Sequence, residues 1–365
     1  MRRATLVIFF LTVASVAGAQ TTRLTGELPQ KEVRPLEATA GLETEYGDVR
    51  VSDGYRLRTI LTRPVGTRGK LPAILFIQAV SCGSLELPPE SQSTMRQLPI
   101  RSGFAFIRVE RAGSGDSEGP ACAALDYDTE VRHYREAFDQ LAQHPWVDPD
   151  RIVIYGSSLG STTAPLIAQG KTIAGIFVQG GGALTYLERM VHFDRFYFER
   201  SGKFPPREVH DRVLKSVRFN QQYLLSRKTP EQVERDNPDL AGVWQSMRGT
   251  AEAPPHYGRP HAWHWQAATK NFLAAWERIE APVLVVYGEY DQFEPRHSHQ
   301  MIVDAVNALR PGTATFVEMK AIDHSLTTYS SAYAAYREEG GKLDREAFLV
   351  PVLDWLKSLR LLAHE

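Results

Sequence analysis

One short segment, residues 151–167 (RIVIYGSSLGSTTAPLI), limits the possible folds of this chain more than any other. It begins with a β-branched and aromatic run, residues 152–155, turns through Gly-Ser-Ser-Leu-Gly, and continues into small residues that can form a helix. The pattern predicts a strand, a tight turn and a helix, with Ser158 at the apex of the turn.

The two glycines around Ser158 have a steric explanation. A serine on so sharp a turn has a strained backbone, and side chains two residues before or after it would collide with the neighbouring strand or helix, so Gly156 and Gly160 occupy those positions. The turn also directs the backbone N–H of Leu159, at the positive end of the following helix, toward the place where a tetrahedral oxyanion would form. Ser158 is therefore the predicted nucleophile.

An acid and a histidine follow this turn in the chain, each just after a predicted strand. Asp291 comes three residues after Gly288, which ends the apolar run 282–288. His324 lies just past the predicted strand 315–319, and it is the only one of the 11 histidines in such a position. Glu289 and Glu294 are the alternative acids.

The G-x-S-x-G turn, the G-x-x-D acid and the chain order Ser, acid, His resemble the α/β-hydrolase superfamily. The resemblance implies that Ser158 attacks an acyl carbonyl, that His324 is the base, and that Asp291 orients His324. It implies no cofactor and no metal. Gln78-Ala79-Val80 stands where the superfamily usually has His-Gly-X, and the N–H of the X residue is there the second oxyanion donor beside that of Leu159. The resemblance therefore implies Val80 as this donor, or Ala79 if the alignment differs by one residue.

The rest of the chain alternates strand and helix patterns. The predicted fold is α/β, a mostly parallel α/β-hydrolase sheet with helices on both faces, built from residues 43–182 and 277–365. A hairpin is predicted around Asp53-Gly54 and a turn at residues 148–150. The other expected strands are residues 73–77, 104–110 and 173–179, and the expected helices are residues 126–143, 298–309 and 344–361.

Residues 183–276 have a different pattern, with helical patches, many aromatic residues and no β-branched run. The superfamily commonly inserts a helical cap here, and a cap would set substrate size and exclude water. Its histidines His256, His261 and His264 lack a carboxylate or cysteine that would complete a metal site, so aromatic packing or substrate contact is favoured. His297 and His299 open a later helix, where solvent exposure is expected.

Two further features concern the edge of the predicted site. Residues 111–119 resemble the D-x-R-G-x-G-x-S turn that flanks the active site in many hydrolases, although a plain surface turn explains them equally well. Cys82 and Cys122 both follow adjacent parallel strands on the side where the serine emerges, and we expect them to form a disulfide.

The N-terminus has the three parts of a secretory signal peptide. Met1-Arg2-Arg3 precedes an apolar run to about Val16, and Ala17-Gly18-Ala19 is a small-residue cleavage site. We expect cleavage after Ala19 and a secreted or periplasmic protein; an uncleaved membrane anchor is the alternative. Residues 20–42 are expected to be a loosely held lead-in.

Charge and the predicted site together indicate the class of activity. The net charge of −1, with both signs interspersed, gives no basic stripe for nucleic acid. We predict hydrolysis of carboxylic esters, with a small-molecule ester or short peptide as substrate. A serine peptidase of the aminopeptidase or prolyl-oligopeptidase type is the alternative. Ser161 stands where those peptidases usually have glycine, which favours the esterase. Glu188, Asp194 and Glu199 lie in the predicted cap, so a site that binds a protonated substrate amine is not excluded. The oligomeric state is not predicted.

Overall fold

The computed structural model describes residues 24–25, 28–31, 35–37, 39–88, 91–247 and 256–359. The predicted signal peptide, residues 1–19, lies outside these described residues. Within them, no helix is both long enough and apolar enough to cross a bilayer.

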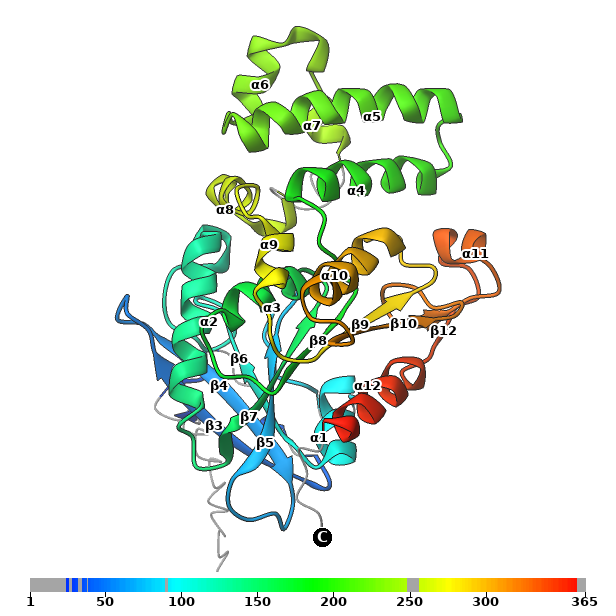
Figure 1. Cartoon of the computed structure of the whole chain (residues 1–365). Coiled ribbons are helices and arrows are strands. Elements are labelled where there is room, and N and C mark those ends of the chain that lie inside the picture. Colours follow the sequence, from blue (N-terminus) through cyan, green and yellow to red (C-terminus); the bar gives the residue numbers. More distant parts are fainter. Residues whose placement is uncertain are drawn as a thin grey trace, which may run out of the picture.

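The centre of the molecule is an eight-stranded sheet of order β10-β9-β8-β7-β5-β6-β4-β3 (Figure 1). The β3–β4 and β4–β6 pairs are antiparallel, and the other five pairs are parallel, so the predicted mostly parallel sheet is confirmed. Its strands are β3 (Leu42–Arg50), β4 (Arg56–Pro64), β5 (Leu71–Ile77), β6 (Ala105–Val109), β7 (Val147–Ser157), β8 (Gly175–Gln179), β9 (Val283–Gly288) and β10 (Ala314–Met319).

Helices cover both faces because the central strands are apolar on both sides. On one face the core includes side chains of α2 (Tyr127–Leu141), α3 (Leu159–Ala168), α9 (Phe272–Glu277) and α10 (Arg296–Leu309). On the other face it includes side chains of α1 (Thr94–Ser102) and α12 (Glu346–Ser358). Every residue of β6, β8 and β9 is buried, as a sheet covered on both faces requires.

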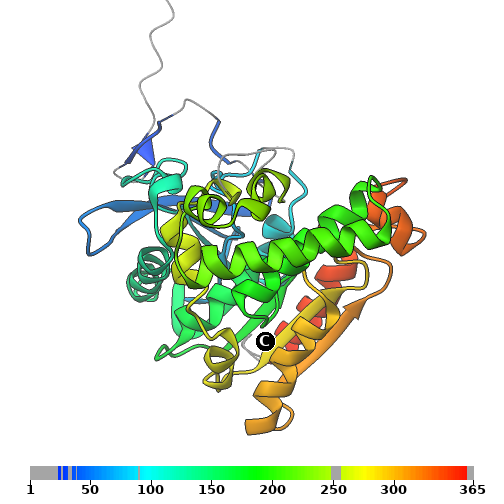
Figure 2. The same cartoon turned by 90° about the horizontal axis from the view of Figure 1, so that it is seen from above.

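The segment predicted as a cap lies above the end of the sheet from which the Ser158 turn emerges (Figure 1). Seen from above, its long helices extend across the middle of the molecule (Figure 2). We call residues 183–276 the helical insertion. Its described residues form α4 (Tyr186–Ser201), α5 (Pro206–Asn220), α6 (Pro230–Asp236), α7 (Val243–Ser246), α8 (His261–Ala267) and all but the last residue of α9, with the short helical turns η2 (Gln221–Leu225), η3 (Pro238–Leu240) and η4 (His256–Gly258).

Several small elements complete the described chain. Two of them, β1 and β2, pair with each other, as do β11 and β12. Their bounds, with those of η1 and α11, are β1 (Leu24–Thr25), β2 (Leu28–Pro29), η1 (Cys122–Ala124), β11 (Thr327–Thr328), α11 (Ala332–Arg337) and β12 (Lys342–Leu343).

Three expectations from the sequence were wrong in detail. Residues 148–150 form no separate turn; they belong to β7, whose pairing with β5 shifts register between Leu71 and Ala73. His299 is fully buried rather than exposed, with its ring centroid 4.9 Å from that of Tyr287, because it lies on the inner face of α10. The lead-in is not loosely held throughout, since Leu28 is fully buried and the Glu37 carboxylate pairs with Arg108 at 2.5 Å.

Candidate active site

Ser158 lies at the turn between β7 and α3. Its backbone has φ 52° and ψ −123°, a conformation that L-residues rarely adopt, and its N–H donates to the carbonyl of Gln179 at 2.7 Å. A Cβ on Gly156 would lie 2.7 Å from the carbonyl oxygen of Gly160, and a Cβ on Gly160 would lie 2.2 Å from that of Ile77. The two glycines are therefore required sterically, as the sequence predicted.

Asp291 and His324 reach Ser158 from the loops that follow β9 and β10. The carboxyl ends of parallel strands meet at one edge of a sheet, which brings together residues far apart in the chain. His324 Nε2 lies 3.0 Å from Ser158 Oγ, and His324 Nδ1 lies 2.8 Å from Asp291 Oδ2. The other carboxylate oxygen of Asp291 accepts the backbone N–H groups of Phe293 and Glu294 at 2.8 and 3.0 Å.

The hydrogen-bonded chain from Asp291 through His324 to Ser158 has the order that is needed to remove the proton from a serine nucleophile. Burial disfavours the charged imidazole, but the Asp291 carboxylate attracts it and accepts its hydrogen bond, so the pKa of His324 is raised above its ordinary value. Burial likewise opposes ionisation of Asp291, but His324 and the backbone donors lower the pKa of this carboxyl. Asp291 is thus held ionised beside an imidazole whose Nε2 faces the serine hydroxyl.

A cavity of about 190 Å³ opens beside Ser158 and His324. Leu159 and Val80 line it, and Leu159 is the first residue of α3, where a helix leaves its N–H groups without intrahelical partners. Val80 lines the cavity, whereas Ala79 is not among its lining residues. The remaining lining residues are Gly180, Tyr186, Arg189, Met190, Phe193, Tyr257, Phe293 and Glu294.

The cavity is lined mostly by apolar groups and holds one buried ion pair. Arg189 of α4 pairs with Glu294, and their side chains are only 3% and 2% exposed. Burial raises the pKa of Glu294, a shift that Arg189 opposes. Phe293 packs against His324 with ring centroids 4.7 Å apart and against Phe193 at 5.6 Å. The sequence had presented Glu294 only as an alternative acid, and no motif marked Arg189.

Glu188, Asp194 and Glu199, the acids that the sequence offered for binding a substrate amine, do not line this cavity. Glu188 belongs to the N-terminal capping box of α4 with Thr185. Asp194 accepts a hydrogen bond from Asn220, and Glu199 pairs with Arg195 and accepts from the Tyr336 hydroxyl.

Two of the three histidines considered as a metal cluster, His261 and His264, pack among aromatic rings. His264 is fully buried, with Nδ1 2.8 Å from the Tyr186 hydroxyl, and His261 Nδ1 lies 3.1 Å from the Tyr223 hydroxyl. The side chain of His256 lies outside the described residues. This arrangement is the aromatic packing that the sequence favoured.

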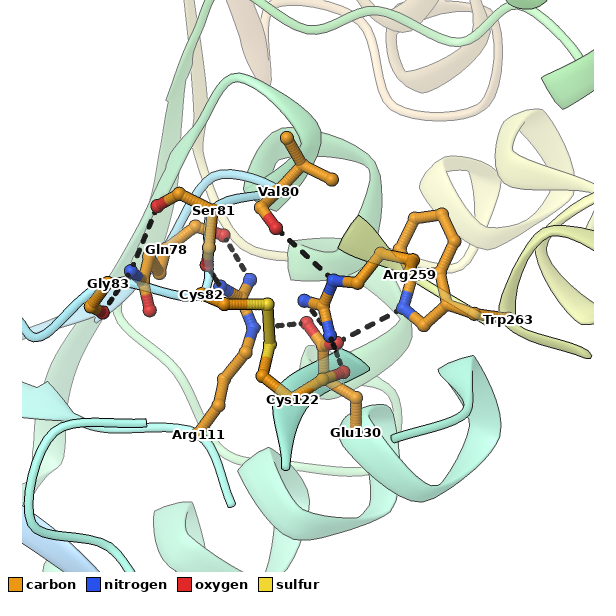
Figure 3. The surroundings of a disulfide bond; sticks show 10 residues. All are labelled: Gln78, Val80, Ser81, Cys82, Gly83, Arg111, Cys122, Glu130, Arg259 and Trp263. Atoms are coloured by element: carbon orange, nitrogen blue, oxygen red, sulfur yellow. Dashed lines mark hydrogen bonds and ion pairs between the residues drawn. A yellow bond between two sulfur atoms is a disulfide. The ribbon is translucent and has the colours of Figure 1, made fainter. Parts of the chain in front are cut away.

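The two cysteines form the expected disulfide, with Cα atoms 5.7 Å apart (Figure 3). Cys82 lies in the loop after β5, and Cys122 lies in η1 after the glycine-rich turn. The bridge therefore joins the loop that carries Val80 to the segment that follows residues 111–119. Arg111 of that turn is buried and donates to the carbonyls of Gln78 and Ser81, so the turn is more than a surface feature.

Together the fold and its site define a hydrolase of the α/β-hydrolase superfamily. Residues 53–311 match the family model described as X-Pro dipeptidyl-peptidase (S15 family). This match covers more than half of the chain, and the chain belongs to that family.

Individual relatives are distant. A polyketide transferase of Stachybotrys chlorohalonatus is 32% identical over 122 residues, which are 33% of this chain and 39% of that protein. The esterase FrsA of Photorhabdus laumondii is 25% identical over 230 residues, 60% of this chain and 52% of that protein. The chain thus spans about half or less of the length of these relatives. The acylaminoacyl peptidase of Pyrococcus horikoshii shares the fold, with a TM-score of 0.54 and 13% identity over 87% of this chain and 41% of that chain.

Proposed function

We propose that this protein hydrolyses carboxylic esters through an acyl-enzyme on Ser158, with His324 as general base, Asp291 as its orienting acid, and the N–H groups of Leu159 and Val80 as oxyanion donors. The observation that carries the proposal is the hydrogen-bonded chain from Asp291 through His324 to Ser158 Oγ, open to an apolar cavity.

The proposed reaction has two halves. Ser158 Oγ attacks the ester carbonyl while its proton moves to His324 Nε2, and the carbonyl oxygen becomes an oxyanion between the two N–H donors. The intermediate collapses, the C–O bond to the alcohol breaks, and His324 returns its proton to the leaving alkoxide. Water then attacks the acyl-serine by the same proton route and releases the acid.

The lining of the cavity supports an apolar acyl group as substrate. Its aromatic and aliphatic side chains give up little on losing water, and its single acid, Glu294, is already paired with Arg189. A protonated substrate amine would have to separate that buried pair, at a cost of several kcal/mol. An uncharged acyl chain needs no such change.

A serine peptidase is the second candidate because the family model that the chain matches is described by a peptidase activity. The same nucleophile, base and oxyanion donors would serve peptide cleavage. The two candidates differ in whether the cavity recognises a free α-amine.

The choice is tested by comparing kcat/KM on two substrate series. We expect short-chain p-nitrophenyl esters to exceed aminoacyl and prolyl p-nitroanilides by at least about a hundredfold, roughly 2.7 kcal/mol in transition-state stabilisation. Because activated esters react readily, the ratio is the criterion, and Ser158→Ala is the background control on both series. A reversed ratio would support the peptidase.

A second comparison isolates amine recognition. If the protein is an aminopeptidase, leucine p-nitroanilide should be cleaved far faster than its N-acetyl derivative, whereas the esterase proposal predicts that acetylation changes kcat/KM by less than about tenfold.

We also propose that the protein is exported and begins at Gln20 after removal of residues 1–19. Mass spectrometry of the N-terminal peptide of the protein recovered from the medium or the periplasmic fraction tests this, and it also detects an N-terminal glutamine that has cyclised. A recovered N-terminus at Met1, in a membrane fraction, would instead indicate the uncleaved anchor.

A further inference from the structure

The loop that carries Val80 is held by its carbonyl groups. Arg111 donates from Nη2 to the carbonyl of Gln78 at 2.8 Å and from Nη1 to that of Ser81 at 2.6 Å. Arg259 donates from Nε to the carbonyl of Val80 at 3.2 Å (Figure 3). Three of the four carbonyls from Gln78 to Ser81 are therefore fixed by two guanidinium groups.

These contacts bracket the peptide unit that would donate to the oxyanion. The Val80 N–H belongs to the peptide between Ala79 and Val80, and the held carbonyls of Gln78 and Val80 belong to the peptide units on either side of it. Fixing both neighbours restricts rotation of the central unit. A donor that is already oriented costs no reorganisation when the negative charge develops.

One carboxylate holds both arginines. Glu130 of α2 pairs with Arg111 Nε at 2.6 Å and with Arg259 Nη2 at 2.9 Å, and it accepts the indole N–H of Trp263 at 3.1 Å. The Arg259 and Glu130 side chains are 0% and 3% exposed. Burial opposes ionisation of Glu130, but the two guanidinium groups outweigh it and lower the pKa of the carboxyl. The cluster is thus a fully desolvated ionic unit below the loop.

The cluster also links the loop to two other parts of the molecule. Arg259 and Trp263 belong to the helical insertion, immediately before and within α8. Arg259 Nη1 further donates to the carbonyl of Cys122 at 3.4 Å, and Cys122 is bonded to Cys82 of the same loop (Figure 3).

We infer that Arg259 is a positioning residue for the reaction: from the helical insertion it fixes the Val80 N–H in the orientation that receives the oxyanion. This inference rests on the proposed function. It gives the insertion a role in the chemical step besides covering the cavity, because a shift of α8 would move the guanidinium that holds Val80.

Arg259→Lys is the most informative substitution. Lysine keeps a positive charge beside Glu130 but replaces the planar group of three nitrogens by one ammonium, which cannot serve Glu130, Val80 and Cys122 together. We expect kcat for a p-nitrophenyl ester to fall between about tenfold and a hundredfold, with KM changed less than about threefold. Arg218→Met is the matched control, an insertion arginine paired with Asp239 at the surface, and it should leave both constants unchanged.

A trifluoromethyl ketone separates positioning from general packing, because its adduct with the serine places an oxyanion where the transition state has one. Its Ki should rise in Arg259→Lys by the same factor as kcat/KM falls. An unchanged kcat in a folded Arg259→Lys protein, or a loss confined to KM with no change in Ki, would overturn the inference.

Trp263→Phe provides a milder test if Arg259→Lys does not fold, since it removes the indole N–H from Glu130 and keeps a smaller aromatic ring in its place. We expect kcat to fall about threefold to fivefold with a parallel rise in Ki, a smaller loss than in Arg259→Lys, because Glu130 keeps both arginines and loses one of its three partners. No change in either quantity would contradict the inference. If the proposed function itself is wrong, the unaltered protein will show no ester turnover that depends on Ser158. This result is seen before any Arg259 or Trp263 variant is measured.

Discussion

At the scale of single residues, the charge state of His324 controls the proposed reaction. Only the neutral imidazole can accept the Ser158 proton, and the Asp291 carboxylate raises the pKa of His324 above its ordinary value. We therefore expect kcat/KM to rise with pH through an apparent pKa above about 6.5. The same shift means that protonated His324 stabilises the folded protein at low pH, and that this contribution is lost as pH rises through the folded pKa. A rate that is flat between pH 5 and 8 would contradict a histidine base.

Replacing Asp291 tests its orienting role. Asp291→Asn removes the charge that stabilises the imidazolium, so we expect kcat to fall by about three to four orders of magnitude and the apparent pKa of His324 to decrease. Glu289→Gln is the matched control, because this alternative acid binds the backbone N–H of Ala321 and pairs with Lys320 at the surface. Equal losses in both variants would remove Asp291 from the proposed role.

The sequence identified the residues whose positions follow from chain order and strand ends. Ser158, Asp291 and His324 each follow a recognisable strand, and parallel strands bring their ends together. It could not identify Arg189 or Arg259, because each belongs to the helical insertion and has a partner elsewhere in the chain, Glu294 and Glu130. Pairings of this kind depend on how the insertion docks, and no local pattern encodes that.

At the scale of elements, the contact between the Ser158 turn and the end of β5 leaves no room for a side chain at Gly160. A Cβ there would lie 2.2 Å from the carbonyl oxygen of Ile77 and 2.9 Å from that of Gln78, both backbone atoms. We expect Gly160→Ala to cost about 1–3 kcal/mol in the free energy of unfolding and to lower kcat by displacing the Val80 loop. Gly83→Ala, which meets nothing within 4 Å, should change stability by less than about 0.5 kcal/mol. Urea unfolding and ester kinetics measure both, and indistinguishable variants would contradict the steric account.

Elements were predictable where periodicity is strong. The buried strands and α2, α10 and α12 were expected within a few residues of their observed bounds. Helix α1 was not expected, because Pro99 lies inside it and its sequence is mostly polar. The extension of β7 through residues 148–150 overrides local turn preferences, because pairing of Val147 with Leu71 of β5 holds it extended.

At the scale of the whole molecule, a buried ionic cluster attaches the N-terminal segment to the sheet. Both carboxylate oxygens of Glu37 accept hydrogen bonds from the Arg108 guanidinium, at 2.5 and 3.0 Å. Glu37 also accepts a hydrogen bond from the backbone N–H of Leu87 at 2.6 Å. Glu37→Ala would leave Arg108 buried without its partner, and we expect a loss of about 3–5 kcal/mol in the free energy of unfolding. Glu43→Ala, which removes a half-exposed pair with Arg63, should cost less than about 1 kcal/mol. Equal effects in urea titrations would show that the segment is attached in another way.

The central claim, that Ser158 is the nucleophile, is tested most directly by covalent labelling with an alkyl phosphonofluoridate and mass spectrometry of the digested protein. The account predicts one adduct, on Ser158, that forms in step with loss of ester turnover, is absent in Ser158→Ala, and forms far more slowly in His324→Ala. An adduct on Ser157 or Ser161, or full turnover in a protein whose Ser158 is labelled, would contradict it.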